Sequence, residues 1–98
     1  MQLPLQIAFR GIPASAALEA RIGECVEKLE KVHPRLLSCR VAVESPGHHR
    51  SHGRHFAVHV ELQALDKPHA INARHEHEDV YVALRDAFDA ARHQLQAG

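Results

Sequence analysis

The side chains most able to do chemistry are histidines, which number ten in this chain of 98 residues. Four of them follow the spacing HHxxHxxH in a turn-rich segment: His48, His49, His52 and His55. Imidazole binds transition metals, but no Cys or Asp lies within the cluster to complete a recognisable ligand set. Protonated imidazole would instead attract phosphate as the pH falls, because its ordinary pKa lies near 6.5. The pattern leaves open a metal site, a pH-dependent phosphate contact and a solvated loop, and we expect one of the last two.

Cations on two predicted helices form the second group of candidates. They are Arg21, Lys28 and Lys31 on one flank of the first helix and Arg85 and Arg92, seven residues apart, on the last. One interpretation is a solvated surface with ion pairs one helical turn apart, namely Glu24/Lys28 and Glu27/Lys31. The other is a surface that follows the phosphates of a nucleic acid. Glu24 interrupts the basic flank, whereas Glu19, Glu27 and Glu30 lean to the opposite one.

Further cations fall on predicted strands and loops. Arg10, Arg40, His59 and Arg74 alternate with apolar strand residues, which places them on the solvent face of a sheet. Arg50 and Arg54 lie in the histidine-rich segment. No exposed aromatic residues stand ready to stack bases, so we do not expect sequence-specific base recognition.

Nothing in the sequence indicates an enzyme. It contains no Gly-x-Ser-x-Gly motif, no phosphate-binding glycine loop and no Cys in an activating context. The run His75-Glu76-His77-Glu78 either caps the last helix or joins a metal site. We therefore predict a non-enzymatic protein with no cofactor, no metal and no small-molecule substrate.

Length and composition predict one globular domain over residues 1–98, because 45% of the residues are hydrophobic and 24% are charged. Twelve Lys and Arg residues balance twelve Asp and Glu residues, unlike the basic excess of most nucleic-acid-binding modules. Protonated histidines would add about +2 at pH 7 and about +7 to +8 at pH 6. No signal peptide or membrane-spanning run is recognisable. Cys25 and Cys39 have no metal-site spacing, so we expect reduced, buried thiols and a cytoplasmic protein.

Hydrophobic periodicity predicts the elements that position these side chains. Alternation indicates strands around residues 3–9, 37–44, 55–62 and 69–74, and a period of 3.6 residues indicates helices over 16–32 and 79–96. Ser15 is the expected cap of the first helix. The strand residues expected to face inward are Leu3, Leu5, Ile7 and Phe9; Leu37, Cys39, Val41 and Val43; Phe56, Val58, Val60 and Leu62; Ile71 and Ala73. We expect an α+β fold, β-α-β-β-β-α, with both helices on one face of a four-stranded sheet.

The order of these elements and two sequence runs resemble a known family. The runs are EKLEKV at Glu27–Val32 and HEHEDVYVALRDAFDAARHQLQ at His75–Gln96. Glu78, Asp79, Tyr81, Ala83, Leu84, Gln94 and Leu95 stand where that family's last helix has its typical residues. The chain thus resembles the short form of the ribosome hibernation-promoting factor and ribosome-associated inhibitor family, also called sigma-54 modulation proteins.

The resemblance implies a mixed sheet similar to that of a double-stranded-RNA-binding domain. It also implies a hibernation factor that binds rRNA of the small ribosomal subunit near the decoding region and represses translation under stress or in stationary phase. The residues expected to contact rRNA are Arg21, Lys28, Lys31, Arg85, Arg92, Arg40, Arg74, Arg50 and Arg54, with His48, His49, His52 and His55 as pH-dependent contacts. The chain departs from the family in its zero net charge, in Ala90 after Asp89, and in histidines where relatives carry Lys or Arg. The alternative is a histidine-rich metal-binding or protein-interaction domain of the same fold without strong ribosome affinity.

Overall fold

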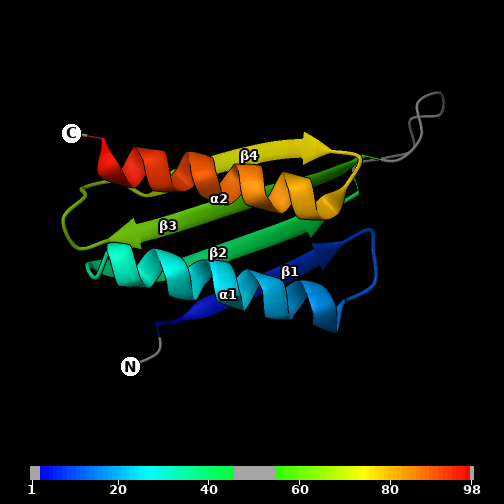
Figure 1. Cartoon of the computed structure of the whole chain (residues 1–98), viewed down its shortest axis with the longest axis horizontal. Helices are drawn as coiled ribbons and strands as arrows, with labels where there is room; N and C mark the ends of the chain where they lie inside the picture. Colours follow the sequence, from blue (N-terminus) through cyan, green and yellow to red (C-terminus); the bar gives the residue numbers. More distant parts are fainter. Residues whose placement is uncertain (1–2, 46–54, 98) are drawn as a thin grey trace.

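Six elements follow one another in the order β-α-β-β-β-α (Figure 1). The structure, a computed structural model, describes residues 3–45 and 55–97. The elements are β1 (Leu5–Arg10), α1 (Ala16–Val32), β2 (Leu36–Glu44), β3 (Phe56–Ala64), β4 (Ile71–His77) and α2 (Val80–Gln96). The α+β fold predicted from the sequence is therefore confirmed.

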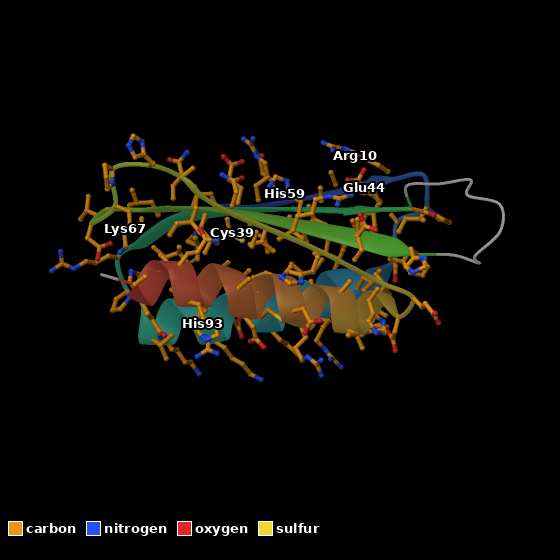
Figure 2. The ribbon with its side chains drawn as sticks, turned by 90° about the horizontal axis from the view of Figure 1, so that it is seen from above. Arg10, Cys39, Glu44, His59, Lys67 and His93 are labelled. Atoms are coloured by element: carbon orange, nitrogen blue, oxygen red, sulfur yellow. The ribbon has the colours of Figure 1, made fainter. Side chains whose placement is uncertain are left out.

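The four strands form one mixed sheet in the order β1-β2-β3-β4. β1 runs parallel to β2, as expected for two neighbouring strands joined by a helical crossover, and the other two pairs are antiparallel. Both helices lie on one face of the sheet (Figure 2). In that view Arg10, Glu44 and His59 project from the opposite face of the sheet, and we call this face the open face.

Local sequence signals set the ends of both helices. The Ser15 hydroxyl accepts a hydrogen bond from the Leu18 backbone N–H at 3.2 Å, which confirms the predicted N-cap of α1. A carboxylate of Asp79 accepts from the Tyr81 N–H at 2.9 Å and begins α2 in the same way. Pro34 follows the C-cap residue His33 and prevents α1 from continuing.

The core lies between the helix layer and the inner sheet face. Its fully enclosed side chains include Ile22, Leu62, Leu84, Val41, Val43, Val58 and Val60. Among the described residues no polar or charged residue is fully buried. Within residues 3–45 and 55–97, neither helix combines the length and the apolar character that crossing a membrane would require.

Two predictions about the strands were wrong in detail. Leu37 was expected to face inward, but it is 49% exposed and Leu36 fills the core at 5% exposure. The β2–β3 register shifts between Leu36 and Ser38, and this irregularity reverses the alternation at the strand's start. The fourth strand extends to His77, which pairs with Phe56, so Glu76 lies in β4 and not at the start of α2. The length of β4 is therefore set by pairing with β3 and not by the local sequence pattern of β4.

A contact between His33 and Asp66 joins the end of α1 to the turn between β3 and β4. The Nε2 atom of His33 lies 3.5 Å from Oδ1 of Asp66, and both side chains are more than half shielded from solvent. Burial by itself would raise the pKa of the Asp66 carboxyl, but its own backbone N–H, the His33 ring and Lys67 together lower that pKa.

Asp66 should therefore stabilise the fold in a pH-dependent way. A carboxyl whose folded pKa lies below its unfolded value of about 4 stabilises the fold above that pH, and this contribution is lost as the pH falls through the folded pKa. We expect Asp66→Asn to lower the midpoint of urea unfolding at pH 7, with the gap to the wild type closing on acidification to about pH 2.5. An equal difference between the two unfolding midpoints at pH 7 and about pH 2.5 would contradict a lowered pKa of Asp66 in the folded protein.

Candidate nucleic-acid interface

A groove lies on the surface between the two helices. Its volume is about 530 Å³. The floor is apolar and is formed by Cys25, Leu29, Leu84 and Phe88, while Val32 and Tyr81 line it closer to solvent. Four of the five helix cations predicted from the sequence line this same groove: Arg21, Lys28, Arg85 and Arg92. We call these four residues the groove cations.

The groove cations come from both helices, Arg21 and Lys28 from α1 and Arg85 and Arg92 from α2. The helices run in the same direction (Figure 1), and the guanidinium carbon of Arg21 lies 5.3 Å from the centre of the Tyr81 ring. On each helix the two cations are seven residues apart, which is about 10 Å along the helix axis at 1.5 Å per residue. A set of cations spread over this length suits a polyanion backbone better than a single small anion.

Carboxylates accompany three of the groove cations. Arg21 lies 3.5 Å from Glu24, Arg85 lies 3.2 Å from Asp86, and Arg92 lies 3.7 Å from Asp89. In each pair the side chains are at least one-third exposed, and such pairs contribute only about 0–1 kcal/mol. A phosphate can therefore replace the carboxylate at small cost. Within the described residues, Lys28 has no carboxylate within ion-pair distance, and neither predicted pair, Glu24/Lys28 or Glu27/Lys31, is formed.

The two cysteines differ in how far they are enclosed. Cys25 is half-buried in the wall of the groove, where burial raises the pKa of its thiol and Lys28 and Arg21 partly offset the increase. Cys39 lies in β2 and is buried in the core, and burial raises the pKa of its thiol to about 12. Both thiols are free, as the sequence predicted.

The structure does not bring all the predicted cations to the groove. Lys31 is exposed on α1 but does not line the groove. Arg40 and Arg74 lie on the open face, where each is held by a carboxylate, Glu61 at 3.5 Å and Glu76 at 2.6 Å respectively. Arg40 also donates to the Gln6 side chain at 3.2 Å. The cations of the open face are thus spread among acidic and amide groups, unlike those of the groove.

Most of the histidine-rich segment lies outside the described residues, namely His48, His49, Arg50, His52 and Arg54, whereas His55 is exposed just before β3. Over residues 3–45 and 55–97, no group of three His, Cys, Asp or Glu side chains could hold a metal ion. His77 uses Nδ1 to accept a hydrogen bond from the Asp79 N–H at 2.9 Å, which favours the capping interpretation of the His75–Glu78 run.

Sequence reasoning missed the role of Tyr81. In the sequence Tyr81 stands out as typical of the family's last helix, but in the structure the ring is 39% exposed and carries the Arg21 guanidinium. A cation over an aromatic face at an exposed site contributes about 0.5–1 kcal/mol. Only the parallel arrangement of two helices, which depends on the sheet, brings these residues together.

Comparison with known proteins supports the fold and identifies a family signature. Residues 5–97 match the family described as "Sigma 54 modulation protein / S30EA ribosomal protein". The fold is similar to that of a ribosomal subunit interface protein from Coxiella burnetii, with a TM-score of 0.77 at 15% identity, covering 95% of this chain and 93% of that one. It is also similar to the N-terminal domain of Thermus thermophilus Protein Y, with a TM-score of 0.78 at 13% identity, covering 96% and 97%. No curated protein sequence matches the chain.

The position of Cys25 in the groove wall predicts selective alkylation. Because thiolates are the reactive form and Cys39 is both buried and of high pKa, we expect iodoacetamide at about pH 8 to modify Cys25 and leave Cys39 unmodified until the protein is unfolded. Mass spectrometry of tryptic peptides measures both sites. Equal modification of the two cysteines in the folded protein would show that the core is more open than described.

Proposed function

The chain belongs to the sigma 54 modulation protein / S30EA ribosomal protein family, and we propose that it binds the small ribosomal subunit through rRNA near the decoding region. Bound there, it represses translation under stress or in stationary phase. This family consists of non-enzymatic, ribosome-associated proteins. The observation that carries the proposal for this chain is the row of four groove cations between two parallel helices.

The groove supports rRNA binding for three reasons. Its cations are exposed enough to reach a ligand, and their existing carboxylate partners are weakly held. The four cations extend over about 10 Å along the helices and so can meet more than one phosphate of a strand, which a nucleic acid offers at regular intervals. The apolar floor keeps water away from part of each ion pair that a groove cation forms with a phosphate, and so strengthens that ion pair. Most of the polar groups lining the groove are cationic, which suits recognition of rRNA by backbone position and shape.

Repression then follows from occupancy and needs no chemical step. A chain bound where messenger and transfer RNA would lie excludes them sterically. Because net charge is zero, affinity depends on the local row of cations and not on the field of the whole protein. The name of the Coxiella burnetii protein, a ribosomal subunit interface protein, is consistent with a site between the subunits.

Salt dependence measures how many cations meet phosphates. If the four groove cations carry the binding, the logarithm of the association constant should fall with the logarithm of salt concentration at a slope of about −3 to −4. Cosedimentation with purified small subunits between 50 and 300 mM KCl, at constant magnesium, gives this slope. A slope near zero would rule out an electrostatic interface.

Two triple variants, each of which removes three positive charges, test whether the groove or the open face is the interface. The triple change Lys28→Ala, Arg85→Ala and Arg92→Ala removes three groove cations and leaves Arg21 on Tyr81. Its control, Arg10→Ala, Arg40→Ala and Arg74→Ala, removes three cations from the open face. Each triple variant also breaks two surface ion pairs, so their effects on stability should be similar.

The groove variant should lose most of its affinity for small subunits and the control little. If each phosphate contact contributes about 1.5 kcal/mol, three lost contacts weaken binding on the order of 1000-fold and make the salt slope shallower by about 2 to 3. Thermal unfolding of both variants verifies that they fold. Equal loss in the two folded variants would contradict the groove as the interface. Absence of ribosome binding in the wild type would favour the histidine-rich metal-binding or protein-interaction alternative.

A further inference from the structure

The outer edge of β1 presents a row of backbone groups with no partner in the sheet. The carbonyl oxygens of Pro4 and Arg10 accept hydrogen bonds from Cys39 and Ser45 at 3.0 and 3.2 Å. In a parallel ladder the residues that bond to the neighbouring strand alternate with residues that point away. Residues 4, 6, 8 and 10 therefore face β2, and Leu5, Ile7 and Phe9 direct their N–H and C=O groups outward.

The side chains of these three residues are also incompletely covered. Leu5, Ile7 and Phe9 face the helix layer and are half-buried, whereas their neighbours on β2, Cys39, Val41 and Val43, are at most 2% exposed. The other edge strand, β4, carries exposed charged or imidazole side chains over its last four residues, which is a common way of protecting a sheet edge. From Leu5 to Phe9, β1 has no charged residue. An added strand would bury the apolar row and satisfy the free backbone groups together.

The flank of α1 beside this edge is acidic. Arg21, Cys25 and Lys28 line the groove toward α2, so helical periodicity places Glu19, Glu27 and Glu30 on the flank turned toward β1 (Figure 1). In the described residues none of these three carboxylates lies in an ion pair. Glu19 and Glu27 are exposed and Glu30 is partly exposed. A strand approaching β1 therefore meets a negatively charged wall.

We propose that the β1 edge binds an extended, Lys- or Arg-containing peptide segment by strand addition, beside the acidic flank of α1. The backbone of the segment pairs with Leu5, Ile7 and Phe9, and its cations lie against Glu19, Glu27 and Glu30. A second copy of the chain also fits the hydrogen-bond pattern, with Ile7 opposite Ile7 in an antiparallel pair. That arrangement, however, turns two acidic flanks toward each other, so charge favours a cationic partner.

This site is separate from the groove. The groove lies between α1 and α2, whereas the β1 edge borders the far flank of α1. One chain can therefore hold rRNA and a basic protein segment at the same time. The inference does not depend on the proposed function, and its test is independent of ribosome binding.

The test uses an acetylated, amidated peptide, Lys-Thr-Val-Thr-Lys-Thr-Val, in which Lys and Val share one face of the strand, added to the ¹⁵N-labelled full chain. We expect the largest amide shifts at Leu5, Ile7 and Phe9, with hydrogen exchange of these amides slowed at least about tenfold. A peptide with N-methyl groups on alternate residues along one edge, and a second with Glu in place of Lys, should bind much more weakly. Binding that is indifferent to N-methylation, or shifts centred on the open face, would overturn strand addition.

Two sets of variants separate backbone pairing from charge. Ile7→Pro removes an outward donor without touching the ladder to β2, so thermal unfolding should show a folded protein, and that protein should no longer bind the peptide. The triple change of Glu19, Glu27 and Glu30 to Gln should weaken peptide binding about tenfold, while Glu44, Glu61 and Glu76 to Gln, on the open face, should leave it unchanged. If the unmodified chain self-associates without peptide and protects the same three amides, a second copy occupies the edge and the proposal is wrong.

Discussion

The burial of one sheet face beneath two helices is the constraint on which the rest of the structure depends. The inner side chains of β2 and β3, including Val41, Val43, Val58 and Val60, are fully enclosed only because both helices cover the same face. Burial of this kind contributes roughly 1.5–3 kcal/mol for each large apolar side chain. The outer surface between these two parallel helices is hollowed into the groove. The groove with its cations is thus a consequence of how the core is closed.

Charge is balanced in total but unevenly distributed over the surface. The groove carries four cations with three carboxylates beside them, the far flank of α1 carries three carboxylates, and the open face pairs Arg40 and Arg74 with Glu61 and Glu76. A net charge of zero therefore hides one surface suited to a polyanion and another suited to a cationic segment. Arg21 belongs to both the packing and the chemistry, because the contact with Tyr81 that joins the two helices also places its guanidinium at the groove. Surfaces of opposite sign on one small fold allow two partners without competition.

Local pattern was sufficient to predict the elements and the layer arrangement. The apolar stripes of both helices, the cap at Ser15 and the alternation in β1 and β3 are short-range signals, and the structure confirms them. The position of Leu37 and the length of β4 depend on pairing with β3, which no local window contains. The sequence also indicated the cations but could not tell which of them share a surface. Lys28 and Lys31 lie three residues apart on one helix, yet only Lys28 lines the groove. Which of the two faces α2 depends on how the sheet positions the two helices.

The orientation of the chain on the ribosome is the most direct test of the account. An iron chelate that generates hydroxyl radicals can be attached at the groove rim through Glu24→Cys, or on the open face through Gln63→Cys, each in a Cys25→Ser background where buried Cys39 stays unlabelled. With the labelled chains bound to small subunits, primer extension locates the cleaved rRNA positions. The account predicts strong cleavage near the decoding region from position 24 and much weaker cleavage from position 63. Stronger cleavage from position 63 would show that the open face, and not the groove, meets the rRNA.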